Sequence, residues 1–313
     1  MTLKYCKVSD LLSSVISGEW GVEPLSEGSV NIIRTTNFLN NGQINFNNIV
    51  NRFVDKSIVA KKKLLPGDLI IEKSGGSPNQ PVGRVVYFEN ADNEIYLCNN
   101  FTAILRPNAN ISSKYLFYSL FFKHLTKRTL NYQNKTTGII NLQLNRYLES
   151  EKIPLPSLDE QHRIVKILDL AQSLIEKRKQ AIAYLDDYIK AVFLDMFGDP
   201  LSKTPKFRIV NLEDIAIKEK NSIVDGPFGS SLNNNDYYDD GIPIIRIANV
   251  RDTGFCEDDF KYITETKYDQ LIRSKIEFND ILIPRVGNSI GKLCLFNKKY
   301  KALLSTTGVA KAS

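Results

Sequence analysis

The chain has 313 residues, of which 42% are hydrophobic, so it is long enough to hold two domains that each bury a core. Lys and Arg number 41 against 35 Asp and Glu, and the net charge of +6 is compatible with a nucleic-acid partner without establishing one. The four cysteines are far apart, which argues against a disulfide framework or a cysteine zinc site, and no apolar run has the length of a signal peptide or a membrane span. We therefore expect a cytoplasmic protein without membrane association.

Short β-rich runs, separated by Gly, Asn and Pro, fill the first 150 residues. They predict strands at residues 31–35, 69–72, 84–88 and 101–105. Residues 112–125 then predict an amphipathic helix, with serines at its start that can cap it.

Residues 157–197 contain no Pro or Gly and predict one long helix. Ser157 and Glu160 have capping-box spacing, and Gly198 and Pro200 follow the last turn. Apolar residues recur at alternating steps of four and three, which is the pattern of a coiled-coil seam. The seam consists of Ile164, Leu168, Ala171, Ile175, Ile182, Leu185, Ile189, Val192 and Met196, with the charged Arg178 as its one interruption. Such a helix is about 60 Å long and can act as a spacer; a long core helix of a single domain is the alternative interpretation.

The part after this helix repeats the part before it. At one constant offset, Arg34, Asn37, Asp68, Lys73 and Gly75 align with Arg246, Asn249, Asp280, Arg285 and Gly287. After a short gap, Val82-Gly83-Arg84 matches Ile290-Gly291-Lys292. One domain is therefore written twice. The second copy stops at the counterpart of Pro107, so we expect it to lack core partners and the natural protein to be longer, or this chain to be a truncated form.

Catalytic motifs are scarce. His124 and His162 are too few for a His-based triad or metal cluster. Residues 287–293 resemble a phosphate loop, but they have one residue too few between the two glycines. They also have Leu293 in place of the hydroxyl residue that binds magnesium. Asp68, Glu72 and Lys73 resemble a nuclease centre, yet adjacent strand residues point to opposite faces. We expect no catalytic residue, no metal ligand and no bound cofactor.

Two loops, residues 73–84 and 285–292, are rich in Gly, Asn, Ser and basic side chains and follow buried-looking strands. Glycine lets the backbone approach a ligand closely, and Lys and Arg contact phosphates. Asn, Gln and Arg side chains form hydrogen bonds with base edges. A flexible hairpin with solvated charges is the alternative for either loop.

The segment IPLPSLDEQHRIVKILD, preceded by Asn141-Leu142 and followed by the long helix up to FGDP, resembles the central conserved region of type I restriction-modification specificity subunits. DGPFGSSL at 225–232, GIPIIRIANV at 241–250 and DILIPRVGNSIGK at 280–292 resemble the target recognition domain of that family. The resemblance covers essentially the whole chain. Family members run recognition domain, helix, recognition domain, helix, with the helices paired as an antiparallel coiled coil; here the second helix is absent and the second domain is short.

The resemblance implies an α/β (α+β) fold, in which two homologous mixed α/β target recognition domains are joined by a long coiled-coil-forming helix. We expect the first domain at residues 1–156, the helix at 157–197 and the incomplete second domain at 198–313. Each domain would read one half of a bipartite site in double-stranded DNA, and the chain itself would perform no chemistry. Methyltransferase subunits would carry S-adenosylmethionine and methylate adenine, and a restriction (motor-nuclease) subunit with ATP and magnesium would cleave unmodified DNA.

Candidate DNA contacts follow from this resemblance. They are Lys73, Arg84, Arg285, Asn288 and Lys292 in the loops, with Lys135 and Thr136 as further candidates. For Arg34 and Arg246, a structural ion pair with a carboxylate is the alternative. Helix pairing and subunit docking are assigned to Ile175, Ile182, Leu185 and Ile189, through which two copies of the chain would also pair with two-fold symmetry.

Two other classes of protein fit the same sequence. One is the specificity half of a fused type II-like restriction-modification enzyme, whose catalytic motifs would lie beyond Ser313. The other is a coiled-coil scaffold unrelated to DNA, whose interactions would be insensitive to salt.

Overall fold

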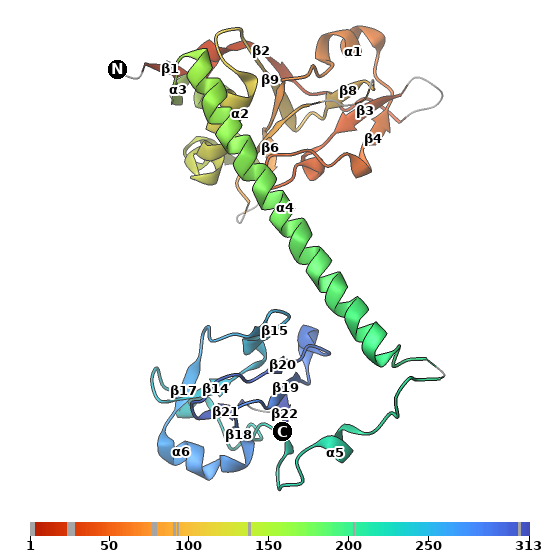
Figure 1. Cartoon of the computed structure of the whole chain (residues 1–313). Coiled ribbons are helices and arrows are strands. Elements are labelled where there is room, and N and C mark those ends of the chain that lie inside the picture. The colour runs from red at the N-terminus through yellow and green to blue at the C-terminus, as the bar shows by residue number, and fades with distance from the viewer. Residues whose placement is uncertain are drawn as a thin grey trace. The chain divides into compact units, whose positions relative to one another are not determined.

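A computed structural model describes residues 4–23, 29–76, 80–89, 92, 94–136, 139–202, 204–305 and 308–313, of which Lys135 and Thr136 are described by their backbone alone. The chain divides into two compact units, Met1–Asp186 and Asp187–Ser313, which are treated separately below (Figure 1).

The core of the first unit begins with an antiparallel four-stranded sheet. Its strand order is β2 (Leu12–Ser17), β9 (Thr102–Pro107), β5 (Leu69–Glu72) and β7 (Val85–Tyr87). Strand β5 lies in the middle, with Leu69 opposite Leu105 on one side and opposite Tyr87 on the other. All four of its residues are buried, which explains why the run is apolar up to Glu72.

A second, three-stranded sheet covers one side of this core. It has the order β4 (Val50–Arg52), β3 (Val30–Ile33) and β8 (Tyr96–Cys98), and β3 pairs with β8 in parallel. Ile33, Phe38, Ile70 and Ile104 join the two sheets in one buried cluster. Helix α1 (Lys56–Lys62) follows β4.

Helices and two small sheets cover the other side. Helix α2 (Ser113–Leu125) buries Tyr115, Leu116, Phe117 and Leu120 in the cluster that contains Leu69. Helix α3 (Leu144–Ser150) buries Tyr147 and Leu148 in the same cluster. The small sheets are β1 (Tyr5–Lys7) with β12 (Lys152–Pro154), and β10 (Gln133–Thr136), β11 (Ile139–Leu142) and β6 (Ser74–Gly76) in that order.

The long helix α4 (Leu158–Phe197) is a single element of 40 residues, drawn in green in Figure 1. Ser157 Oγ accepts the backbone N–H of Glu160 at 3.4 Å, while the Glu160 carboxylate accepts from Arg163 instead of returning a bond to the cap. The helix ends at Gly198, whose φ of 75° is left-handed and whose N–H donates to the carbonyl of Leu194. The helix thus covers residues 158–197, where the sequence predicts one long helix over 157–197.

The second unit contains two four-stranded sheets. One has the order β13 (Ile223–Asp225), β22 (Val309–Ala312), β19 (Ile281–Pro284) and β20 (Cys294–Leu295). The other has the order β17 (Lys261–Ile263), β14 (Ile242–Ile245), β21 (Ala302–Leu304) and β18 (Lys275–Ile276), with β14 and β21 parallel. The hairpin β15 (Val250–Arg251) with β16 (Gly254–Phe255), and the helices α5 (Leu212–Ile215) and α6 (Glu265–Gln270), complete the described elements.

The predicted repeat is confirmed by sheet topology. Strands β13, β22, β19 and β20 occupy the places of β2, β9, β5 and β7, and β17, β14 and β21 those of β4, β3 and β8. The registers also agree, because Ile32 faces Leu97 across a parallel pair just as Ile244 faces Leu303. Both copies are mixed α/β, as expected.

The two copies differ in how the first sheet is covered. In the first unit Tyr87 contacts Phe117 of α2 at 5.9 Å between ring centroids, and Leu69 beside it is fully buried. In the second unit the corresponding strand end carries Leu295, which is 55% exposed. The strand end that α2 covers in the first unit is therefore exposed at its counterpart in the second. Within the described part of the chain, no helix combines the length and the apolar character needed to cross a bilayer.

Candidate nucleic-acid interface

Lys73 follows directly after β5 and begins the first candidate loop. Its Nζ donates to Ser17 Oγ at 3.0 Å, and its backbone N–H donates to the carbonyl of Phe101 at 2.7 Å. Partial burial lowers the pKa of the Lys73 ammonium below its ordinary value. Among the described residues no carboxylate pairs with it. A phosphate is therefore a suitable partner for this charge.

The small three-stranded sheet brings the two predicted regions of the first unit together. Its middle strand, β11, pairs Asn141 with Ser74 and Ile140 with Gly76 on one side. On the other side β11 pairs Ile140 with Lys135, and Ile139 with Thr136. Strands β6 and β10, which carry the two predicted regions, thus flank one strand. Residues 77–79 and 137–138, and the side chains of Lys135 and Thr136, lie outside what the structure describes.

Arg84 is held inside the first unit rather than presented at its surface. Its Nε and Nη2 donate to the two carboxylate oxygens of Glu72 at 3.0 and 2.9 Å. Nη2 also donates to the carbonyl of Thr35, and the guanidinium lies over the ring of Phe38. The side chains of Arg84 and Glu72 are only 15% and 3% exposed. This geometry gives Arg84 a structural role, and we leave it out of the proposed DNA surface.

The acids that resembled a nuclease centre are also internally paired. The Asp68 carboxylate accepts hydrogen bonds from Nε and Nη2 of Arg106 at 2.8 and 2.7 Å, and the Asp68 side chain is 2% exposed. The Glu72 carboxylate accepts from Arg84, while the Lys73 ammonium donates to Ser17 Oγ. The neighbours Glu72 and Lys73 thus contact different partners. In the described residues no group of His, Cys, Asp and Glu is arranged to hold a metal ion.

The candidates of the second unit lie after β19. Arg285 Nη1 contacts Asp225 Oδ2 at 2.6 Å, and Lys292 Nζ contacts Asp252 Oδ2 at 2.8 Å. Asn288 is exposed within the 3₁₀ turn Gly287–Ser289. Because the carboxylate of Asp252 is 77% exposed, its pair with Lys292 contributes little and a phosphate can replace it.

The two loops do not place their matched basic residues in the same surroundings. Where the first unit has Glu72, the second has Pro284, and where the first has Arg84, the second has Lys292. The second unit therefore has no counterpart of the buried Glu72–Arg84 ion pair, and Lys292 pairs with the exposed Asp252 instead. Comparing the copies at both positions together is the sequence signal that identifies Arg84 as the partner of Glu72.

Arg34 and Arg246 begin equivalent turns. In each, the backbone N–H donates at 2.9 Å to the Oδ1 of an asparagine three residues later, Asn37 or Asn249, and both asparagines are buried. The guanidinium of Arg246 pairs with Asp259 at 2.8 Å, as the structural alternative proposed. That of Arg34 donates to the carbonyl of Asn48 at 3.0 Å.

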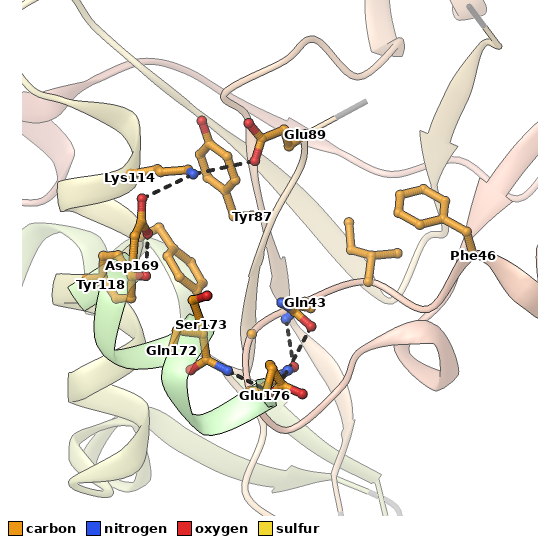
Figure 2. Close-up of a pocket in the computed structure, with 14 residues that line it drawn as sticks. Gln43, Phe46, Tyr87, Glu89, Lys114, Tyr118, Asp169, Gln172, Ser173 and Glu176 are labelled. Carbon is orange, nitrogen blue, oxygen red and sulfur yellow. Dashed lines mark hydrogen bonds and ion pairs between the residues drawn. The ribbon is translucent and has the colours of Figure 1, made fainter. Parts of the chain in front are cut away.

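A cavity of about 600 Å³ lies between part of α4 and the rest of the first unit (Figure 2). Lys114 lies between Asp169 of α4 and Glu89, at 3.4 and 3.5 Å, and Tyr118 donates to Asp169 at 2.6 Å. Burial alone lowers the pKa of Lys114, but the two carboxylates outweigh it and raise that pKa. Farther along α4, Glu176 accepts from Asn41 at 3.3 Å. These contacts fix the first half of α4 on the first unit.

Known proteins share the sequence pattern and the architecture of this chain. Residues 6–184 match the family model described as type I restriction modification DNA specificity domain. The chain is 26% identical to the type I restriction enzyme MjaVIII specificity subunit of Methanocaldococcus jannaschii over 205 residues, which cover 62% of this chain and 47% of that protein. It is 26% identical to the type I restriction enzyme StySPI specificity subunit of Salmonella potsdam over 289 residues, 87% of this chain and 58% of that one. The chain thus spans about half the length of the curated relatives it matches.

Two solved structures share the fold. One comes from work titled as the structural basis of complex assembly and conformational transition of the type I R-M system; it is 14% identical, with a TM-score of 0.55 over 99% of this chain and 76% of that one. The other is the type I restriction-modification S subunit from M. genitalium, 17% identical, with a TM-score of 0.50 over 99% of this chain and 72% of that one. These likenesses confirm the predicted fold class.

Proposed function

Because the chain belongs to the type I restriction modification DNA specificity family, we propose that it is the DNA-reading subunit of a restriction-modification complex. The observation that carries this proposal is the duplication: one sheet topology occurs on both sides of a 40-residue helix in the chain. Each unit reads one half of a bipartite target in double-stranded DNA, and the helix sets the distance between the halves.

In the first unit we propose that the DNA surface is built on Lys73 and the strands β6 and β10. Lys73 supplies a charge that has no carboxylate partner among the described residues, and the backbone of Lys135–Thr136 lies two strands from Ser74 in the same small sheet. In the second unit the surface consists of Arg285, Asn288 and Lys292 after β19. The basic residues contact phosphates, and Asn288 supplies an amide of the kind that reads a base edge.

We further propose that partner subunits perform the chemistry. Methyltransferase subunits carry S-adenosylmethionine and methylate adenine, a restriction subunit with ATP and magnesium cleaves the DNA, and this chain binds none of these cofactors. The role of this chain is to position the methyltransferase subunit over the target adenine, which is then flipped out of the duplex. As a cytoplasmic subunit, it meets the DNA and its partners in one compartment.

Helix α4 offers two apolar stripes for those partners. The seam residues Ile175, Ile182, Leu185 and Ile189 are 49–65% exposed and suit pairing with another helix. A second stripe consists of Ile167, Leu170, Leu174, Tyr184 and Tyr188, which are 53–72% exposed. We assign the second stripe to a methyltransferase subunit. A second copy of this chain is our candidate partner for the seam.

A map of methylated adenines tests this function. Cells that carry the cognate methyltransferase subunit are compared with and without this chain. We expect a bipartite methylated motif that appears only when the chain is present. Identical maps in the two strains would contradict the proposal.

A further inference from the structure

In the second unit an acidic and a basic residue meet at one edge of a sheet. Strand β22 lies between β13 and β19 and is antiparallel to both, so β13 and β19 end at the same edge. Asp225 ends β13, and Arg285 follows β19 directly. The residue of β22 that faces both strands there, Ala310, is small. Arg285 Nη1 therefore reaches across β22 to Asp225 Oδ2 at 2.6 Å.

The first unit has the same arrangement with another pair of residues. Strand β9 lies between β2 and β5, and Ala103 faces both Ser17 and Ile71. Ser17 ends β2, and Lys73, which follows β5, donates from Nζ to Ser17 Oγ at 3.0 Å. Ser17 thus occupies the place that Asp225 has in the second unit, and each receives the matched basic residue. Both copies hold this cation in one place, which is what a shared role in binding requires.

A second guanidinium reaches the same carboxylate from another segment. Arg273 Nη2 contacts Asp225 Oδ1 at 3.2 Å, while Arg285 uses Oδ2. Arg273 belongs to the 3₁₀ turn Ile272–Ser274. The last residue of that turn, Ser274, is 3% exposed and donates from Oγ to the carbonyl of Asp225 at 3.0 Å. The turn is therefore anchored to the backbone of β13, and this fixes where Arg273 begins.

The charges at this site do not balance. Two guanidiniums share one carboxylate, and the side chains of Arg273 and Arg285 are 57% and 48% exposed. By contrast, Lys311 and Asp280 of the same unit form a one-to-one pair whose side chains are 4% and 3% exposed. Among the described residues, one nitrogen of each guanidinium is bonded, and the remaining N–H donors are available. A second anion is the partner that this arrangement suits.

The carboxylate of Asp225 lets two like charges lie close together. Without it the guanidiniums would repel each other, and their long side chains would sample many rotamers. Held on one carboxylate, Arg273 and Arg285 lose less conformational entropy when they close on a ligand. A phosphate accepts paired N–H donors from guanidiniums, and the DNA backbone presents phosphates along both strands.

We propose that Arg273 and Arg285 together bind one phosphate of the DNA backbone, and that Asp225 positions both of them. This assignment rests on the proposed function, to which it adds one contact, Arg273, and one positioning residue. In the first unit Ser17 positions Lys73 in the same way. Such a site fixes the register of the second unit on the duplex and has no sequence preference of its own.

The sign of one substitution tests the positioning role. Asp225→Asn removes a negative charge, so a carboxylate that merely repels DNA would give tighter binding when it is replaced. If Asp225 positions the arginines, Asp225→Asn weakens binding about threefold or more, although the chain becomes more basic. In a chain that also carries Arg273→Met and Arg285→Met, it should change the affinity less than about twofold. Fluorescence anisotropy of the whole chain with a labelled DNA duplex measures these affinities.

Arg273→Met tests the phosphate contact. It should weaken binding about five- to tenfold at about 0.1 M salt and lower the slope of log K against log salt by about 1. The loss should be equal on two duplexes of unrelated sequence, because a phosphate contact reads no base. Because Arg273 is exposed to solvent, this variant tests the site even where Asp225→Asn does not fold.

Lys301→Met is the matched control. The Lys301 side chain is 58% exposed and pairs with Glu265, so it resembles Arg273 in exposure and in having an acidic partner. It precedes the amino end of β21, whereas Arg273 precedes β18, which is antiparallel to β21 and begins beside its other end. The control should change the affinity less than about twofold, because it leaves the phosphate site intact.

Three results would overturn the inference and leave the proposed function standing. They are tighter DNA binding by Asp225→Asn, equal effects of Arg273→Met and Lys301→Met, and a loss in Arg273→Met that is confined to one of the two duplexes. In each case the parent chain still binds DNA with a steep dependence on salt. A parent that binds neither duplex, alone or with its methyltransferase subunits, contradicts the proposed function and the phosphate site together.

Discussion

Replacing Arg84 with Met separates a structural role for this residue from a role in DNA contact. The substitution keeps most of the side-chain volume and removes the guanidinium. Glu72, whose side chain is 3% exposed, then keeps its charge without the bonds at 3.0 and 2.9 Å that now neutralise it. The carbonyl of Thr35 loses its donor as well.

The cost follows from this geometry. Removing one member of a buried ion pair costs about 3–5 kcal/mol, because the remaining charge is left uncompensated. For a unit of this size each kcal/mol lowers the melting temperature by about 2–4 °C, so we expect a fall of roughly 10 °C in the transition of the first unit. The double variant Glu72→Gln with Arg84→Met should recover much of this loss.

Scanning calorimetry, with hydrogen exchange at the amides of β5 and β7, measures the effect. Lys73→Met is the control, because Lys73 has no carboxylate partner among the described residues and should change stability little. If Arg84→Met leaves the melting temperature within about 2 °C of the parent but abolishes DNA binding, Arg84 is a DNA contact and the structural assignment is wrong.

Three further predictions concern pH, the repeat and salt. Burial raises the pKa of Glu151, but bonds from Lys123 and Tyr132 outweigh it and hold that pKa below its ordinary 4.5. The unfolding free energy should therefore fall as the pH drops below about 4.5, and it should fall less steeply in Glu151→Gln. Urea unfolding at several pH values measures this; an equal slope of unfolding free energy against pH in the parent and the variant would contradict it. Asn37→Ala and Asn249→Ala should each destabilise their own unit by about 1–3 kcal/mol, with faster hydrogen exchange at the following turn; an effect in one unit alone would argue against equivalent turns. DNA affinity should fall steeply with salt, and Lys73→Met should reduce the slope of log K against log salt by about 1; salt-insensitive binding would favour a scaffold.

Local patterns in the sequence predict much of this fold. The strand at 69–72 and the helix at 157–197 are found at those positions, because an apolar run bounded by turn residues and a long heptad pattern depend on neighbouring residues alone. The repeat is also visible in the sequence, because Arg34 with Asn37 and Arg246 with Asn249 keep the same spacing and the same bond.

Contacts between strands were harder to predict. The ion pair of Glu72 with Arg84 depends on how β5 lies beside β7, and the approach of Lys135 to the strand after Lys73 depends on β11 lying between them. Register of this kind is set by the packed core and not by local composition. For that reason local composition predicts Arg84 as a DNA-contacting loop residue, although its side chain is bound to Glu72 inside the first unit.

The central claim is that each unit reads its own half of the target. The most direct measurement maps methylated adenines for a chain in which Arg285, Asn288 and Lys292 are replaced by Met, Ala and Met, beside the parent chain and the Lys73→Met variant. We predict that the triple variant loses sequence preference in one half of the motif and keeps the other half unchanged. Loss of both halves together, or an unaltered motif, would contradict the account.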